Sequence, residues 1–204
     1  MSNERTLEGY IEAVASPSPA PGGGSVVGVV GALAAALGQM VLNFTHTSDG
    51  EHAAQRDKLI SALEDCRARL LQGASQDEVA YQGYRNAANL PKATAEEKAT
   101  RRSAMQAALV DATDVPLAMA EQAAHLATLL VEVAQIGSRQ LAADTAWSTL
   151  LAEATLRGAL INVRGNAALL KDQEKAQSYR EAADRMETAG RQAAATALEI
   201  ASAA

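Results

Sequence analysis

The chain has 204 residues, a net charge of −6, and 48% hydrophobic residues but only 3% aromatic ones. The acidic balance argues against a nucleic-acid surface, because phosphate contacts need clustered Lys and Arg. Cys66 stands alone, so there is no disulfide framework, and the charged residues Glu4, Arg5 and Glu8 argue against a signal peptide. We therefore expect a cytoplasmic protein with one domain over residues 1–204, built from closely packed Ala-rich helices.

The first strong helical pattern covers residues 25–44. The stretch is uncharged and long enough to cross a bilayer, but Gln39 and Asn43 lie within it and no Lys or Arg flanks it. A buried helix is therefore favoured over a membrane span. Its small residues recur every three or four positions and predict a bare face for close helix packing: Gly24, Gly28, Gly31, Ala35 and Gly38. A second, bulky face carries Val26, Val30, Leu33, Leu37, Met40 and Phe44. Burial of both faces predicts a central helix or a subunit interface, and with it a homodimer.

Two helices are predicted in the next part of the chain. One apolar stripe consists of Leu59, Leu63, Cys66 and Leu70, and a separate short helix is expected from about Gln76 to Ala88, before Leu90-Pro91. Thr94 and Glu97 form a capping-box pattern that predicts the start of a long helix. Its stripe runs through Met105, Leu109, Ala112, Pro116, Met119, Ala123, Leu126, Leu130 and Val133. Because the stripe stays in phase past Pro116, this proline should kink the helix without ending it.

The last third of the chain predicts two further helices. One, after Gly137, carries a stripe of Trp147, Leu151, Ala154, Gly158, Ile161 and Gly165. The other, from about Asp172, has Tyr179, Ala183, Met186 and Gly190 on its buried side. No segment alternates with a period of two residues, so we predict an all-α, single-domain bundle of about six or seven helices around the Gly/Ala-rich central helix.

The segment Pro17–Ser25 is the most unusual in the chain. Its prolines stiffen the backbone, its glycines permit conformations closed to other residues, and Ser25 can cap the helix that follows. Free N–H groups at this helix start would suit a carboxylate or a polar heterocycle, and a tight turn without a ligand is the equal alternative. No Lys follows the glycines, which excludes a phosphate-binding P-loop.

Four blocks carry a resemblance to a known family. The sequence from Pro19 to Thr45 resembles the opening of the formimidoyltetrahydrofolate cyclodeaminase and methenyltetrahydrofolate cyclohydrolase family. Residues 77–92, 101–117 and 143–166 are similar to its later blocks, in the same order. Departures fall at 137–140 and 143–144, where the family often has additional Asn and Ser residues, and at 47–52, which replace a Lys-rich turn.

This resemblance implies one of two reactions in one-carbon metabolism. A cyclohydrolase converts 5,10-methenyltetrahydrofolate to 10-formyltetrahydrofolate, and a cyclodeaminase closes 5-formimidoyltetrahydrofolate with release of ammonia. Neither needs a metal or a cofactor beyond the tetrahydrofolate-bound substrate. The length of the chain favours the cyclohydrolase. A non-catalytic helical dimer that binds folate, or serves only as an interaction module, remains the alternative from another class.

The candidate catalytic residues are Asp77 and Asp144, which both lie in family blocks. A carboxylate in a closed pocket could activate water or balance the cationic methenyl carbon, whereas the structural alternatives are a helix-start Asp and a salt bridge. Asn162 and Asn166 share one helix face, with Arg164 pointing elsewhere; they could bind a pterin or tie two helices together. The other candidate substrate-binding residues are Pro21, Gly22, Gly23, Gly24, Ser25, Asn43, Thr45, Lys92 and Arg101, the last two for a glutamate tail. His46, His52 and His125 lack metal-ligand spacing, so no metal site is predicted.

Overall fold

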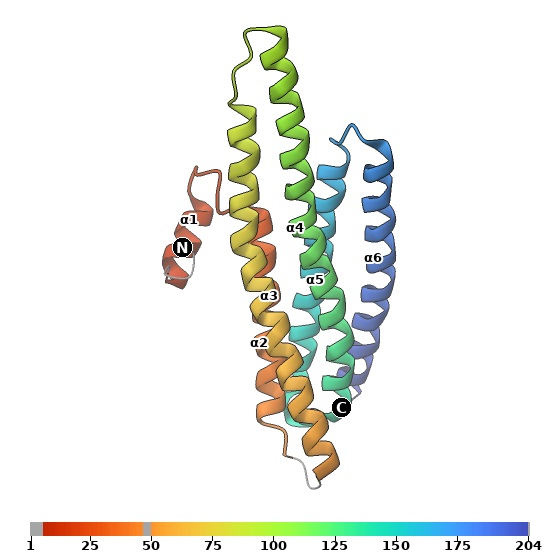
Figure 1. The fold of residues 1–204 in the computed structure, drawn as a ribbon. Coiled ribbons are helices and arrows are strands. Elements are labelled where there is room, and N and C mark those ends of the chain that lie inside the picture. The colour runs from red at the N-terminus through yellow and green to blue at the C-terminus, as the bar shows by residue number, and fades with distance from the viewer. Residues whose placement is uncertain (1–5, 47–49, 204) are drawn as a thin grey trace.

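The computed structural model describes residues 6–46 and 50–203, which form an up-and-down helical bundle (Figure 1). Its elements are α1 (Leu7–Ala15), α2 (Gly23–Asn43), α3 (Gly50–Ala88), α4 (Ala95–Ile136), the 3-10 turn η2 (Arg139–Leu141), α5 (Ala142–Ala167) and α6 (Gln173–Ser202). Consecutive helices from α2 to α6 run antiparallel, while α1 lies beside the bundle. The described residues contain no strand, so the predicted all-α bundle is confirmed. Residues 1–5, 47–49 and 204 lie outside the described part, so only the second half of the segment at 47–52 is described, where Gly50 begins α3.

Helix α4 is the centre of the bundle, because it packs against α3, α5 and α6. The predicted capping box is present: the backbone N–H of Glu97 donates to Thr94 Oγ1 at 3.1 Å, and Glu97 Oε2 accepts from the Thr94 N–H at 3.0 Å. Pro116 is buried within α4, and the helix continues past it to Ile136 as predicted. Large side chains from four helices fill the core: Leu42, Leu63, Leu70, Met119, Leu126, Leu130, Leu156 and Leu160.

Helix α3 corrects one prediction, because it runs without a break for 39 residues. A separate helix from Gln76 to Ala88 was expected where the stripe of large apolar residues stops. The stripe stops because small residues take over at the contacts. A Cβ at Gly73 of α3 would lie 2.6 Å from Met119 Cγ of α4, so the close approach of the two helices favours a glycine at this position. Close helix packing, and not the end of a helix, explains why the stripe of large apolar residues stops.

The bare face of α2 packs closely against its neighbours, as predicted. A Cβ at Gly28 would lie 2.6 Å from the Leu70 carbonyl oxygen and 2.8 Å from the Ala74 backbone nitrogen. A Cβ at Gly31 would lie 2.7 Å from a Thr155 methyl group, on α5. The glycines therefore set the distance between α2 and the helices that flank it, α3 and α5.

Because the atoms facing Gly28 belong to the α3 backbone, Gly28→Ala is expected to be destabilising. We expect the free energy of unfolding to fall by about 1–3 kcal/mol, measured by urea denaturation. The control is Gly83→Ala at an exposed position of α3, where a Cβ meets nothing within 4 Å. Helix propensity should make that variant as stable as the wild type or slightly more stable. Equal denaturation midpoints for the Gly28→Ala variant and the wild type would contradict the close α2–α3 packing.

The bulky faces predicted on α2 and α5 are not buried within the chain. Leu33 is 55% exposed, Trp147 60% and Ile161 69%. The side of α5 that faces the core instead carries Leu156 and Leu160 among small and polar residues: Ser148, Thr149, Ala152, Thr155, Ala159 and Val163. α2 and α4 are both long and apolar enough to span a membrane, and 50% and 44% of their most apolar windows are buried in the bundle.

Candidate active site

A cavity of about 340 Å³ lies where the start of α2 meets α3, α4 and the end of α5. Its volume is in the range of small-molecule sites. Six predicted site residues line it: Gly22, Gly23, Gly24, Asp77, Asn162 and Asn166. A wider apolar groove of about 610 Å³ between α3 and α4 contains neither these amides nor Asp77. We therefore take the smaller cavity as the candidate site.

The carboxylate of Asp77 lies against the first turn of α2. Gly22 is the N-cap of this helix and provides no side-chain cap. The backbone N–H of Ser25 instead donates to Asp77 of α3. A Cβ at Gly24 would overlap this carboxylate, so a glycine is needed for the close approach. The prediction that Ser25 caps α2 is therefore wrong, and one of the N–H groups expected to receive a ligand already binds Asp77.

The environment of Asp77 favours its protonated form. Burial raises the pKa of its carboxyl group above the usual value of 3.8, the N–H of Ser25 lowers it, and the charge of Glu78 raises it further. The rise dominates because desolvation penalises the charged carboxylate. A carboxyl group with a raised pKa at a cavity wall is suited to accept a proton and to return it during a reaction.

A second set of polar groups joins α1, α2 and α3 beside the cavity. Ser25 Oγ lies 3.0 Å from the hydroxyl of Tyr10 and donates to Glu78 Oε1 at 3.3 Å. Ser25 is buried, while Glu78 and Tyr84 line the cavity. The sequence interpretation overlooked Glu78 and Tyr84. Tyr84 follows Asp77 by seven residues, a helical repeat that could have placed both on one face of α3.

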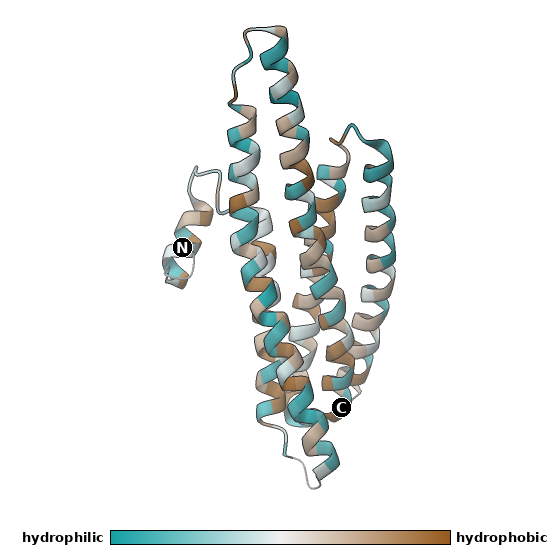
Figure 2. Cartoon of the chain, viewed as in Figure 1, coloured by the Kyte–Doolittle hydropathy of each residue, from teal (hydrophilic) through white to brown (hydrophobic). Residues whose placement is uncertain are grey.

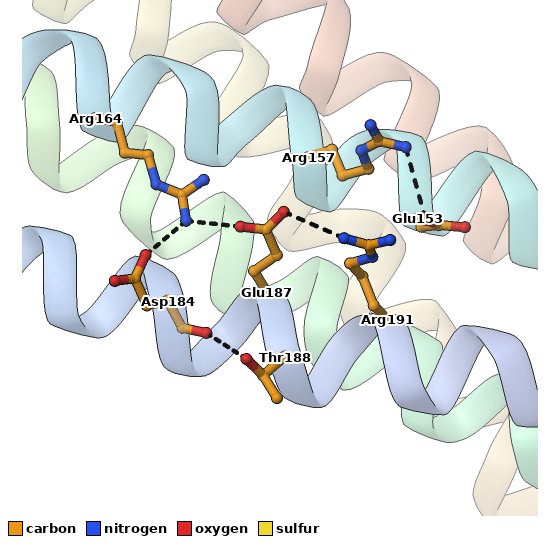
Figure 3. Close-up of polar contacts among 7 residues, drawn as sticks. All are labelled: Glu153, Arg157, Arg164, Asp184, Glu187, Thr188 and Arg191. Atoms are coloured by element: carbon orange, nitrogen blue, oxygen red, sulfur yellow. Dashed lines mark hydrogen bonds and ion pairs between the residues drawn. The ribbon is translucent and has the colours of Figure 1, made fainter.

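The positions of the two α5 amides are compatible with both interpretations of their spacing. Asn162 and Asn166 line the cavity, and Asn166 Nδ2 also donates to the Ala112 carbonyl oxygen at 2.7 Å, which ties α5 to α4. Arg164 points away from the cavity, as predicted, and its partners lie on α6. It donates to Asp184 Oδ1 at 2.8 Å and Glu187 Oε2 at 2.7 Å (Figure 3), and these bonds raise its pKa.

Asp144 does not reach this cavity, which corrects the prediction that both carboxylates serve one pocket. It lies in the first turn of α5 and precedes Asn162 by 18 residues. At the rise of an α-helix this spacing is about 27 Å. The family block at residues 143–166 contains Asp144, Asn162 and Asn166. It therefore extends along nearly all of α5, and only its end faces the cavity.

Asn43 and Thr45 are likewise at the wrong end of α2. The helix is 21 residues long, so its two ends are about 30 Å apart. Asn43 is exposed, whereas Thr45 is buried. Its hydroxyl donates to the Val41 carbonyl at 2.8 Å and accepts the Ser138 N–H at 3.0 Å. Thr45 therefore joins the end of α2 to the turn before α5, and neither residue lines the cavity.

The predicted basic residues lie towards the tip of the α3–α4 hairpin, where hydrophilic residues gather (Figure 2). Lys92 is exposed in the connection between the two helices. Arg101 Nε donates to the Ala88 carbonyl at 2.7 Å, so it satisfies the last turn of α3 and does not line the cavity. Pro21 is buried in the turn before α2. None of the three residues lines the cavity, although Pro21 lies directly between Ala20 and Gly22, which do.

Fold and cavity together define an all-helical protein with a pocket for a polar small molecule. The sequence model of the formiminotransferase-cyclodeaminase family matches residues 6–185, and the chain belongs to this family. The methenyltetrahydrofolate cyclohydrolase of Methylorubrum extorquens is 36% identical over 174 residues, which are 84% of each chain. The formimidoyltransferase-cyclodeaminase of Sus scrofa is 36% identical over 170 residues, which are 82% of this chain and 31% of that protein.

A solved structure extends the comparison to the fold. The crystal structure of formiminotetrahydrofolate cyclodeaminase from Thermotoga maritima superimposes with a TM-score of 0.88 at 27% identity and covers 100% of this chain and 98% of its own. The resemblance inferred from the four sequence blocks is confirmed.

Proposed function

We propose that this chain hydrolyses 5,10-methenyltetrahydrofolate to 10-formyltetrahydrofolate. Support comes from the similarity to the methenyltetrahydrofolate cyclohydrolase of Methylorubrum extorquens over 84% of both chains. The observation that carries the proposal is the partly buried carboxyl group of Asp77 at the cavity wall, with a raised pKa. In the reaction, water adds to the methenyl carbon, the bond from this carbon to N5 breaks, and one proton is released.

In this proposal Asp77 handles the proton. The carboxylate accepts a proton from the attacking water, and the protonated carboxyl group returns it to N5 when the ring opens. Its negative charge also offsets the positive charge of the methenyl group. Tyr81 and Tyr84 line the same cavity and offer aromatic surface to the pterin, while Asn162 and Asn166 offer hydrogen bonds. No metal or redox cofactor takes part.

Cyclodeaminase activity is the second candidate, favoured by the fold of the Thermotoga maritima protein. Purified protein mixed with methenyltetrahydrofolate should accelerate the loss of near-ultraviolet absorbance. Ammonia release from formimidoyltetrahydrofolate without this acceleration would select the cyclodeaminase instead. Folate binding with neither reaction would overturn both activities and leave a non-catalytic binding protein.

We also propose that the protein is a homodimer, formed through α2 and α5. These helices pack against each other and leave apolar side chains uncovered, among them Leu33, Trp147, Leu150 and Ile161. A second copy of the same face would remove this surface from water. Trp147→Lys is therefore expected to shift the protein to monomers in sedimentation at micromolar concentration. Val79→Lys is the control, because Val79 is 73% exposed on α3. A monomeric wild type would contradict the proposal.

A further inference from the structure

Pro116 leaves one carbonyl group of α4 without its helical donor. The N–H of residue 116 would normally donate to the carbonyl oxygen of Ala112, but proline has no N–H. Asn166 of α5 supplies the missing donor, because its Nδ2 lies 2.7 Å from the Ala112 oxygen. A bond within α4 is thus replaced by a bond between α4 and α5, at a point where Ala112 and Asn166 both line the cavity.

This replacement fixes the orientation of the Asn166 amide. A carbonyl oxygen only accepts hydrogen bonds, so the NH₂ end of the amide must face Ala112. Turning the amide over would bring two oxygens together and leave the Ala112 carbonyl without a donor. Among residues 6–46 and 50–203, the amide oxygen of Asn166 has no hydrogen bond. It is therefore held as an acceptor at the cavity wall.

We propose that Pro116 is a positioning residue that, through the Ala112 carbonyl, holds Asn166 as a fixed hydrogen-bond acceptor for an N–H group of the ligand. The ligand class rests on the proposed function: a reduced pterin carries amino and ring N–H donors. A fixed acceptor favours such a donor edge and disfavours an edge that presents oxygen, which would be left unpaired. The same unit therefore contributes to the orientation of the pterin in the cavity.

Pro116→Ala tests this arrangement, because alanine supplies an N–H to the Ala112 carbonyl, which then no longer depends on Asn166 for a donor. Binding of 5-formyltetrahydrofolate, measured by calorimetry, is expected to weaken about threefold to tenfold, as for the loss of one hydrogen bond. Asn166→Ala should have a similar effect, and the double variant should bind no more weakly than Asn166→Ala alone. In steady-state assays the change should appear mainly in KM. Thr128→Ala, which removes a bond to the Ala124 carbonyl on the same helix, is the control.

The amide itself provides a readout that does not depend on folate. The side-chain NH₂ protons of Asn166 should exchange slowly with solvent in the wild type, as seen by NMR, and faster in Pro116→Ala. Equal exchange in both proteins, or unchanged folate affinity in Pro116→Ala, would overturn the inference. A wild type that binds no folate would overturn the proposed function and the ligand class, while the exchange measurement would still decide whether Pro116 positions Asn166.

Discussion

Asp77→Asn is expected to lower kcat for methenyltetrahydrofolate hydrolysis by about 10²–10⁴-fold, the usual contribution of a general acid or base. The amide can still accept the Ser25 N–H at the start of α2, so the fold should persist. It cannot exchange a proton with water or with N5 of the substrate. Initial rates at saturating substrate, followed by the loss of methenyl absorbance, measure this effect.

The same variant should be more stable than the wild type at neutral pH. Burial raises the pKa of Asp77 in the folded state above 3.8, so folding favours the protonated form. The resulting stability is fully present below the unfolded-state pKa and is lost as the pH rises through the folded-state pKa. The amide of the variant is neutral throughout. Its advantage in free energy of unfolding should therefore be present at pH 7 and shrink as the pH falls towards 4.

Asp144→Asn is the matched control for these measurements, because Asp144 lies at the other end of α5 from the cavity. We expect this variant to keep a rate near that of the wild type. A loss of activity in Asp144→Asn as large as that in Asp77→Asn would contradict the assignment of the cavity as the active site. An Asp77→Asn variant with full activity would remove the proposed proton transfer.

Gly24→Ala should impair both folding and activity, because its methyl group would overlap the carboxylate of Asp77. Either Asp77 or the start of α2 must move. We expect a loss of about 1–3 kcal/mol in the free energy of unfolding and about a 100-fold loss in kcat/KM, as for a misplaced catalytic group. Urea denaturation and steady-state kinetics measure the two effects.

Gly23→Ala offers a closely matched control at the preceding position. A Cβ there meets nothing within 4 Å, although Gly23 also lines the cavity. Its stability should equal or slightly exceed that of the wild type, since alanine favours the helix. Indistinguishable stability and kinetics for Gly24→Ala and Gly23→Ala would show that the contact between Gly24 and Asp77 does not matter for the site.

The sequence by itself determined the features that depend on neighbouring residues along one helix. The small-residue face of α2, the capping box at Thr94 and the continuation of α4 through Pro116 all follow from spacings of three to four residues. The ordered blocks also identified the family. The prediction of a break in α3 was wrong because a pattern of large side chains cannot show that Gly73 packs against Met119.

Only the tertiary structure decided which of the candidate residues meet. Asp77 and Asn166 come from different helices and face one cavity, while Asp144 shares a helix and a sequence block with Asn166 but lies at its other end. The pairing of Asn166 with the carbonyl group that Pro116 leaves free was likewise invisible in the sequence. Helical periodicity gives the face of a residue on its own helix, but the order and the ends at which helices adjoin depend on contacts between residues far apart in the chain. Packing of the side-chain-poor α2 between α3 and α5 sets those contacts and brings Asp77 to the cavity wall.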